Sequence, residues 1–245
     1  LTEDGQREEV IRVSAKPSGL GFLPDGSLLI VSMEDEKLMR LKDGQMSVHA
    51  DLAPFVTGHP NDMVIDSQGR AYVGNFGYDL FAEAEPQNAT IVMITPDGNA
   101  RIVADDLVFP NGAVITPDEK IFVVAETFAH RLTAFNIEED GSLSGRRTFG
   151  ELQDAGPDGI CLDVDGGIWV SGFLASKFFR MEDGGNITHE VAVSDKSAVA
   201  CQLGGADGKT LFCLTFGGTL EQIEPGNMFA AVETAKVDSA AAGSP

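Results

Sequence analysis

The sequence predicts an all-β protein with almost no helix. Five segments repeat one plan, in which an alternating apolar run is followed by a tight turn and a second apolar run. These segments begin 43, 50, 47 and 42 residues apart, and no stretch shows a sustained 3.6-residue apolar stripe. The chain of 245 residues, 43% hydrophobic and 22% charged, has the composition of a globular protein large enough for one β domain.

Each repeat opens with a predicted hairpin. A Gly or Glu follows Asp or Gln at the turn, and Gly at that place supplies the positive φ that a tight hairpin needs. The expected strand pairs are Ser18–Phe22 with Ser27–Ser32, Asn61–Ile65 with Arg70–Asn75, Asn111–Ile115 with Lys120–Glu126, Asp158–Leu162 with Gly167–Gly172, and Ala200–Leu203 with Lys209–Phe216.

Two further short β runs follow each of the first four hairpins. Four short strands at a period of about 45 residues are typical of a β-propeller blade, and a β-sandwich or a series of meanders is the alternative. The additional strands are expected at Lys37–Leu41 with Ser47–Leu52, Thr90–Thr95 with Ala100–Asp105, Arg131–Ile137 with Arg146–Leu152, and Ser176–Met181 with Ile187–Val193.

The blade count predicts a six-bladed β-propeller formed by one domain, residues 1–245. Residues 1–13 are expected to contain only the outer strand of a partial first blade, Glu8–Val13, with its other strands on about 40 residues upstream. A closed five-bladed ring is the alternative. The successive blades are expected at residues 17–52, 60–106, 110–152, 157–194 and 198–238.

Charge and cysteine content restrict the partners. The formal net charge of −21 would repel nucleic acid and anionic membrane surfaces, so neither is expected as a partner. No apolar run is long enough to span a bilayer. Cys161, Cys201 and Cys213 lack zinc-site spacing, so buried reduced thiols in a cytoplasmic protein are the expected reading.

The first residues of the innermost strands should meet at one end of the central tunnel, because every repeat begins in the same register. These residues are Ser18, Asn61, Asn111, Asp158 and Ala200. Amide and carboxylate oxygens favour a hard cation, Ca²⁺, Mg²⁺ or Mn²⁺, over zinc. The alternative is that Asn and Asp only terminate strands, since both residue types suit turns.

The links between the second and third strands of each blade should lie at the same end as these polar residues. Two of the links are long, which is typical of functional loops. Their aromatic side chains are expected to wall an apolar pocket around the polar centre. The expected wall residues are Phe76, Tyr78, Phe128, Phe173 and Phe216, whereas Trp169 is expected in the core. His130, in one link, is a weaker acid/base candidate.

Three motifs, in this order and spacing, resemble the SMP-30/gluconolactonase/luciferin-regenerating-enzyme family. They are Pro60-Asn61-Asp62, Pro110-Asn111-Gly112 with Pro117-Asp118 behind it, and Pro157-Asp158-Gly159. The resemblance covers about Ser18 to Val237. It implies a six-bladed propeller that binds one divalent metal on its axis, Ca²⁺ first, with Mg²⁺, Mn²⁺ or Zn²⁺ as the other candidates, and many members hydrolyse lactones or related esters.

The resemblance also implies roles for individual residues. Asn111 and Asp158 match two metal ligands, and Asn61 matches the Asn that lines the same site and contacts substrate or metal-bound water. We expect substrate contacts from His59, Asn61, Ser18, Tyr78, Phe128 and Phe173.

Two features depart from the family's pattern. The family's remaining metal ligand is a Glu in a Glu-Gly-Pro-x-Trp motif on the first blade, and this motif is absent from the sequence. We expect that Glu on the upstream segment. His59 stands two residues before Asn61, where the sugar-lactone enzymes carry Arg, which argues against a sugar acid lactone as substrate.

The predicted function is therefore divalent-metal-dependent hydrolysis of a small-molecule lactone or ester. The metal would polarise the carbonyl and activate a water. Asp158 would take the proton of that water, while Asn61 and Asn111 would stabilise the oxyanion. A non-catalytic propeller that binds a small molecule or a protein is the alternative. A strictosidine-synthase-like condensing enzyme is a third reading, with Glu126 as its only candidate catalytic Glu.

Overall fold

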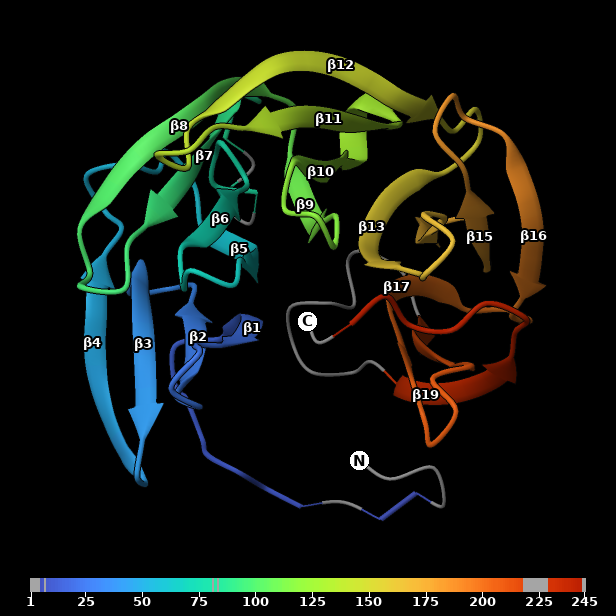
Figure 1. Ribbon diagram of the computed structural model, residues 1–245, viewed down its shortest axis with the longest axis horizontal. Coiled ribbons are helices and arrows are strands. Elements are labelled where there is room, and N and C mark those ends of the chain that lie inside the picture. The colour runs from blue at the N-terminus through green and yellow to red at the C-terminus, as the bar shows by residue number, and fades with distance from the viewer. Residues whose placement is uncertain (1–4, 7, 81, 83, 218–228, 244–245) are drawn as a thin grey trace.

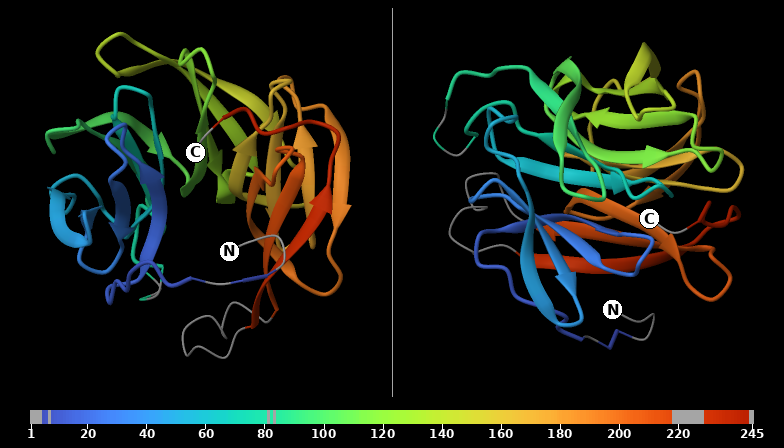
Figure 2. Two further views of the ribbon diagram at one scale, coloured as in Figure 1. Left: turned by 60° about the horizontal axis from the view of Figure 1, so that its bottom comes forward. Right: turned by 60° about the vertical axis from the view of Figure 1, so that its left-hand side comes forward.

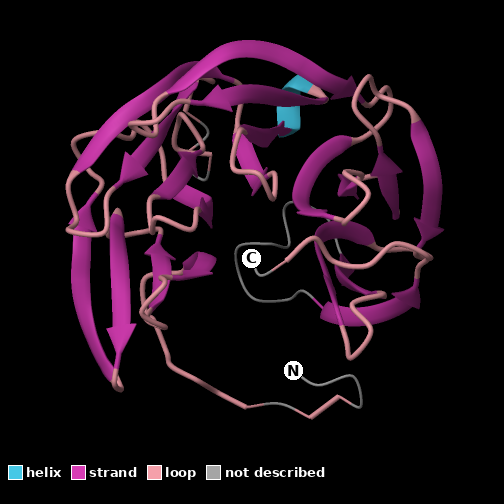
Figure 3. Cartoon of the chain, viewed as in Figure 1, coloured by secondary structure: helices cyan, strands magenta, loops and turns pink. Residues whose placement is uncertain are grey.

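Five antiparallel sheets surround a central axis in the computed structural model of the protein (Figure 1). The structure describes residues 5–6, 8–80, 82, 84–217 and 229–243. Nearly all regular structure in these residues is strand, and the one helical element is the short 3₁₀ helix η1 (Thr127–Ala129) (Figure 3). The expected all-β class is therefore confirmed.

Each of the first four sheets contains four strands in chain order, and the fifth contains three. The first two sheets are β1 (Pro17–Phe22), β2 (Leu28–Ser32), β3 (Lys37–Lys42), β4 (Gln45–Asp51), and β5 (Pro60–Ile65), β6 (Ala71–Asn75), β7 (Ala89–Ile94), β8 (Ala100–Leu107). The remaining three are β9 (Pro110–Ile115), β10 (Ile121–Glu126), β11 (Arg131–Ile137), β12 (Leu143–Glu151); β13 (Gly156–Leu162), β14 (Ile168–Phe173), β15 (Lys177–Met181), β16 (Ile187–Ala192); and β17 (Ser197–Gly204), β18 (Thr210–Gly217), β19 (Phe229–Lys236).

The hydrophobic core lies between neighbouring sheets. The second strand of a sheet is buried along almost its whole length, because sheets cover it on both faces; all five residues of β6 are buried. Tyr72 of β6 packs against Phe122 of β10, and Trp169 of β14 lies 2% exposed beside Cys201 of β17. Burial between the sheets fixes the register of each strand, since a slip of one residue would turn its apolar side chains outward.

The innermost strands share an irregularity at their first residues. In β5, Pro60 pairs with Asn75 and Met63 with Val73, so the strand holds one more residue here than β6 does. The same type of β-bulge occurs in β1, β9, β13 and β17. A bulge changes the direction of side chains and increases twist. Consecutive residues at these strand starts, such as Asn61 and Asp62, can therefore both direct their side chains toward the axis.

Glycine permits close approach between innermost strands at these bulges. A Cβ atom on Gly19 would lie 2.6 Å from the backbone N of Met63, and one on Gly112 would lie 2.6 Å from that of Ile160. Both distances are far shorter than a van der Waals contact. The small residue after Ser18 and after Asn111 therefore allows neighbouring blades to meet at the axis.

The expected partial sixth blade is absent from the described residues, which form a five-blade arrangement. The strand predicted at Glu8–Val13 is wrong, because the described residues before β1 form no strand. Figures 1 and 2 show this segment crossing the opening between the β1–β4 sheet and the β17–β19 sheet. Val10 in this segment is 69% exposed. The segment has no neighbouring strand with which its backbone N–H and C=O groups could form the hydrogen bonds of a sheet.

The C-terminal segment connects the turns of the last two sheets at the end of the axis opposite the bulges. The Ala242 N–H donates to the Leu162 carbonyl (3.1 Å), and the Ala241 N–H donates to the Gly208 carbonyl (3.0 Å). A bridge between Asp163 and Ala241 extends this contact. In the described part of the chain, no helix is long and apolar enough to cross a membrane.

Candidate functional site

Three blades are connected by side-chain hydrogen bonds at the bulged ends of their innermost strands. The Ser18 hydroxyl of β1 donates to Asn61 Oδ1 of β5 (2.7 Å), and Asn61 Nδ2 donates to Asn111 Oδ1 of β9 (3.0 Å). Asn61 and Asn111 are both buried. Residues 43 and 50 positions apart in the sequence thus form one continuous polar chain around the axis.

Thr127 extends this polar chain toward the fourth blade. It was not among the site residues predicted from the sequence. Asn111 Nδ2 donates to Thr127 Oγ1 (3.2 Å), and the Thr127 hydroxyl donates to the carbonyl of Pro157 (2.8 Å), next to Asp158. Thr127 is the first residue of η1 and is 3% exposed. The only sequence signal was its position in a link expected at this end of the tunnel.

Asp158 is a carboxyl group in a poorly solvated position. Burial raises the pKa of Asp158 well above its usual value, and the neighbouring Asp62 raises it further. Hydrogen bonds from the Asn111 side chain and the Gly159 backbone lower the pKa but do not compensate. Among the ion pairs of the described residues, none involves Asp158 or Asp62. The negative charge at this site therefore lacks a protein counter-charge.

Asp62 is a second acidic group at the site, and it was not among the site residues predicted from the sequence. Burial raises the pKa of Asp62 to about 6. In a regular strand, Asp62 would point away from the face that Asn61 occupies, and the bulge in β5 removes this alternation. The signal available in the sequence was the Asn61-Asp62 pair, in a position where the third blade has Asn111-Gly112.

The oxygen donors at the axis suit a hard divalent cation. Asp158 and Asp62 supply carboxylates, Asn61 and Asn111 supply amide oxygens, and Ser18 supplies a hydroxyl. Such donors are typical of Ca²⁺ and Mg²⁺ sites, and a half-buried carboxylate without a counter-charge is stabilised by a cation. No group of three or more His, Cys, Asp or Glu side chains within the described residues is placed to hold a metal. The amide donors would therefore be needed to complete the coordination.

A cavity of about 1010 Å³ follows the axis away from these polar residues. Ser18 and Asp62 line its polar end, and Pro24 and Ala242 line the end formed by the hairpin turns. Between them the wall is largely aliphatic, with Val64, Ile115, Ile160 and Leu162 among its residues. An aliphatic middle section thus separates the polar residues at the bulged end from polar residues of the hairpin turns, such as Asp66 and Glu119, at the other end.

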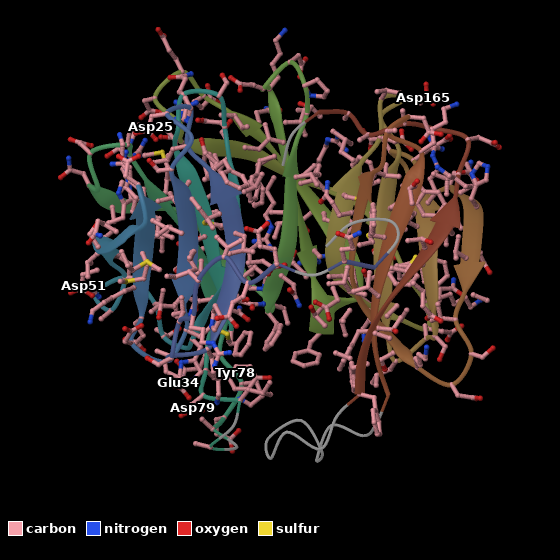
Figure 4. All side chains as sticks on the ribbon, turned by 90° about the horizontal axis from the view of Figure 1, so that it is seen from below. Asp25, Glu34, Asp51, Tyr78, Asp79 and Asp165 are labelled. Atoms are coloured by element: carbon pink, nitrogen blue, oxygen red, sulfur yellow. The ribbon has the colours of Figure 1, made fainter. Side chains whose placement is uncertain are left out.

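The two ends of the molecule are distinguished by their loops (Figure 4). Asp25 and Asp165, in hairpin turns, lie at one end, and Glu34, Tyr78 and Asp79, in links between second and third strands, lie at the other. The first two of the five expected links therefore share one end of the molecule. The link expected at Phe216–Asn227 lies largely outside the described residues.

The loop aromatics form two groups. Phe76 stacks on Phe109 (ring centroids 4.4 Å apart), and Tyr78 and Phe128 contact the same Phe109 ring at 6.2 and 4.7 Å. Phe76 and Tyr78 belong to the core of the first two blades, whereas Phe128 is 45% exposed. Phe109, whose ring contacts the other three, was not predicted from the sequence.

Phe173 and Phe216 form the second group, with ring centroids 6.2 Å apart. Phe216 is buried, and Phe173 is half-buried at the end of β14. No ring contact is present between this pair and the Phe109 group in the described part of the chain. The five predicted wall residues therefore form two separate groups.

The two loop histidines contact backbone carbonyl groups. His59 Nδ1 lies 3.1 Å from the Met33 carbonyl oxygen, and the ring meets Phe76 edge-on at 6.4 Å. His130 Nδ1 lies 3.1 Å from the Ala155 carbonyl oxygen, directly after η1. His59 precedes β5 and so stands close in sequence to Asn61, whereas His130 fastens η1 to the loop before β13.

Glu126 is occupied by a network in the third blade. Its carboxylate accepts hydrogen bonds from Arg131 Nε (2.9 Å), the Thr133 hydroxyl (2.5 Å) and the Val108 N–H (2.8 Å), and Arg146 lies 3.2 Å away. Burial raises the pKa of Glu126, but these partners outweigh it and the net pKa is lowered. Glu126 is not among the residues that line the cavity. These contacts give it a structural role and weaken the condensing-enzyme reading.

Fold and axial residues together define a propeller-type protein with a polar site at the meeting point of its innermost strands. A sequence model of the SMP-30/Gluconolactonase/LRE-like region matches residues 1–217. The chain therefore belongs to the SMP-30/gluconolactonase/luciferin-regenerating-enzyme family, as the Asn61, Asn111 and Asp158 motifs predicted.

The relatives include proteins named for calcium and for lactones. The chain is 27% identical to regucalcin of Bos taurus over 180 residues, which cover 69% of the chain and 60% of the relative. It is 24% identical to 6-deoxy-6-sulfogluconolactonase of Pseudomonas putida over 155 residues, which cover 62% of the chain and 52% of the relative. The matched region thus spans about half to three-fifths of these two relatives.

Solved structures share the fold at low sequence identity. A luciferin-regenerating enzyme superposes with a TM-score of 0.79 at 15% identity, covering 94% of the chain and 81% of the other protein. A calcium-binding regucalcin from Agrobacterium tumefaciens superposes with a TM-score of 0.72 at 21% identity, with the same coverage. These similarities establish the fold.

Proposed function

We propose that the protein hydrolyses a small-molecule lactone or related ester at the axial site, with one divalent cation, Ca²⁺ first among the candidates. The observation that carries this proposal is the half-buried Asp158 carboxyl group without a counter-charge among the described residues, beside the hydrogen-bonded chain of Ser18, Asn61 and Asn111. Two family relatives support it, since one is named a calcium-binding protein and another a sulfogluconolactonase.

Asn111, Asp158 and Asn61 are the proposed ligands of the cation. Asp158 supplies the negative charge, and Thr127 holds the Asn111 amide by accepting a hydrogen bond from its Nδ2 atom. When bound, the cation supplies electrostatic polarisation of the substrate carbonyl and lowers the pKa of water. Asp62 adds negative charge beside this set.

Asp158 and Asn61 are the proposed catalytic residues. The raised pKa of Asp158 makes its carboxylate a better proton acceptor, which suits removal of a proton from an attacking water. One N–H of the Asn61 amide donates to Asn111, and the other would donate to an oxygen that gains negative charge as the ring opens. Both residues are held by neighbours on adjacent blades, so little reorganisation accompanies the reaction.

The proposed substrate contacts are His59, Asn61, Ser18, Tyr78, Phe128 and Phe173. His59 lies on the loop before β5, with its ring against Phe76, and Phe128 exposes its ring beside η1. A polar centre flanked by aromatic rings suits a ring ester with a partly apolar body. The substitution of His59 for the Arg of sugar-lactone enzymes favours a substrate other than a sugar acid lactone.

The whole chain is proposed to act as one propeller domain. The complete ring is proposed to hold six blades, because the arrangement is open between its first and last sheets (Figure 1). The three free cysteines favour the cytoplasm, where thiols stay reduced. No nucleic-acid or membrane partner is proposed, since the net charge is −21.

A non-catalytic ligand-binding propeller is the second candidate. The amide oxygens of Asn61 and Asn111 already accept hydrogen bonds from Ser18 and Asn61, which is the arrangement expected of groups that only close the tunnel. In this reading the aliphatic channel beyond Asp62 would matter more than the acidic groups.

The deciding experiment is hydrolysis of a panel of γ- and δ-lactones and aryl esters with Ca²⁺, Mg²⁺, Mn²⁺ or a chelator. We expect cation-dependent activity that falls at least about 100-fold in Asp158→Asn, since one charged group at the reacting centre is removed. Asn111→Asp should retain more activity, because it keeps an oxygen ligand and adds charge. Asp165→Asn, at the opposite end of the axis, is the matched control.

Activity that ignores both the chelator and Asp158→Asn would rule out the proposed hydrolase. Absence of activity on every substrate, together with saturable binding of a lactone that Asp158→Asn leaves unchanged, would favour the binding propeller. Circular dichroism of each variant separates loss of function from loss of fold.

A further inference from the structure

Two of the three cysteines meet across the contact between the fourth and fifth blades. Cys161 lies on β13 and Cys201 on β17, and the Cys161 Sγ–H donates to Cys201 Sγ at 3.8 Å. The two residues are 40 positions apart in the sequence and belong to different sheets. A disulfide needs the sulfur atoms to approach to about 2.05 Å, so the two sulfur atoms would have to move about 2 Å closer together.

The pair also borders the axial cavity. Both Cys161 and Cys201 line this cavity, although only 3% and 6% of their surfaces are exposed. A molecule as small as hydrogen peroxide can use such a route, whereas a protein thiol or a bulky oxidant cannot. The third cysteine, Cys213, is 2% exposed and is absent from the cavity lining, although it pairs with Cys201 across β17 and β18.

From this geometry we propose that Cys161 and Cys201 form an oxidation site, in which hydrogen peroxide entering the axial cavity converts the two thiols into a disulfide that joins the fourth and fifth blades. This inference does not depend on the proposed hydrolase activity. Nothing in it requires a change of fold, since the two sulfur atoms are already in contact.

The chemistry balances with peroxide as the only oxidant. One thiol loses its proton, and the resulting thiolate attacks a peroxide oxygen, which gives a sulfenic acid and hydroxide. The second sulfur then attacks the sulfenic sulfur, forms the S–S bond and expels the hydroxyl group, which leaves as water. In total, two thiols lose two protons and two electrons, and one peroxide becomes two waters. Burial raises the pKa of the Cys161 thiol, so the reaction should be slow.

Two neighbours connect this pair to the rest of the protein. Trp169, the one tryptophan in the sequence, pairs with Cys161 across β13 and β14, and its carbonyl oxygen lies 3.4 Å from Cys201 Sγ. The Gly159 carbonyl, next to Asp158, lies 3.7 Å from the same sulfur. Bond formation would therefore change both the Trp169 environment and a contact adjacent to the axial site.

The test treats the reduced whole chain with hydrogen peroxide, blocks remaining thiols with an alkylating reagent and maps peptides by mass spectrometry. We expect loss of two hydrogen masses, a cross-linked Cys161–Cys201 peptide, and alkylation of Cys213 alone. Trp169 fluorescence should fall and recover with a thiol reductant. The melting temperature should rise by roughly 5–10 °C, because the bond closes a long loop in the unfolded chain.

Matched variants separate the three thiols. Cys213→Ser should form the same cross-link, whereas Cys161→Ala and Cys201→Ala should form none and should show no reversible change in fluorescence. A cross-link to Cys213 in the folded wild-type chain would overturn the proposal. So would conversion of Cys161 and Cys201 to sulfinic or sulfonic acids without a disulfide, or full alkylation of all three thiols after treatment. The wild-type peptide map decides the question even where a variant fails to fold.

Discussion

Acidic side chains occur in two settings, fully buried between the strands of the blades and half-buried at the axis, and the settings differ in the presence of a cationic partner. Between the strands of the blades, Asp66 lies 2.5 Å from Arg70, Asp163 lies 2.6 Å from Arg180, and Glu126 contacts two arginines. At the axis, Asp62 and Asp158 interact electrostatically with each other and have no such partner among the described residues. The negative charge of the first set is therefore compensated by arginine, and that of the second set is not.

The difference indicates which acidic side chains stabilise the folded protein and which are available to bind a ligand. A paired buried carboxylate keeps its charge, and removing one member leaves the other uncompensated. An unpaired one has a raised pKa and is stabilised by a proton or a cation from outside. Glu126, with its lowered pKa, and Asp62, with a pKa near 6, are the clearest members of the two sets.

The largest expected effect is in the compensated set. Glu126→Gln should lower the free energy of unfolding by about 3 kcal/mol at pH 7, because Arg131 and Arg146 lose their shared anion. The lowered pKa means that this contribution is present above the unfolded-state pKa and is lost as the pH falls through the folded-state pKa. Urea unfolding at several pH values measures it.

Glu139→Gln is the control for that experiment, since Glu139 is exposed and its side chain should contribute within about 0.5 kcal/mol. A Glu126→Gln protein as stable as the control at pH 7 would contradict the structural role assigned to Glu126.

Asp62→Asn should act in the opposite direction. An acid with a pKa raised from 3.8 to about 6 binds its proton more tightly in the folded state, so the wild type loses stability as the pH rises through this window. In chelator, the variant should therefore be more stable by about 2 kcal/mol at pH 7, and by roughly half as much at pH 5. Urea midpoints between pH 5 and 8 provide the measurement, and destabilisation at pH 7 would show that Asp62 has a partner.

Thr127→Val should lower the free energy of unfolding by about 1 kcal/mol, because the hydroxyl exchanges hydrogen bonds with Asn111 and with the Pro157 carbonyl. Thr127→Ser keeps the hydroxyl and should remain close to wild type in stability and in calcium affinity. Calorimetric calcium titration of both variants is the second measurement. Equal calcium affinity in Thr127→Val and wild type would remove Thr127 from the set of positioning residues.

The smallest expected change in stability belongs to Asp158→Asn without metal. Because burial and Asp62 raise the pKa of Asp158, the neutral carboxyl group is favoured and an amide of equal size should alter the free energy of unfolding by less than about 1 kcal/mol. Calcium should raise the melting temperature of the wild type and leave that of the variant unchanged. Thermal scans with calcium or chelator test both statements, and an equal calcium shift in the two proteins would contradict the assigned ligand.

The hairpins of the repeats were predictable because their information is local. Alternating apolar residues on both sides of an Asp-Gly turn favour a hairpin wherever they occur, so β1 with β2 and β13 with β14 fall close to their expected positions. The repeat spacing then requires Ser18, Asn61 and Asn111 to approach one another, and the structure joins them by hydrogen bonds.

Other features depended on partners that no local pattern identifies. The segment Glu8–Val13 contains three β-branched residues, yet it forms no strand, because a strand requires a neighbour to complete its hydrogen bonds. Phe109 connects the loop aromatics only because residues from two separate links, between β6 and β7 and between β10 and β11, converge on its ring.

Periodicity and turn chemistry act over a few residues, so the sequence alone was enough to predict the hairpin strands of the five blades, their order and the polar residues that begin the innermost strands. Tertiary structure alone decided that bulges let Asp62 join Asn61 at the axis, that Thr127 holds Asn111, and that Glu126 is compensated by arginines while Asp158 is not. The physical reason is that charge compensation and side-chain direction depend on which blades meet, and this is settled only when the sheets pack around the axis.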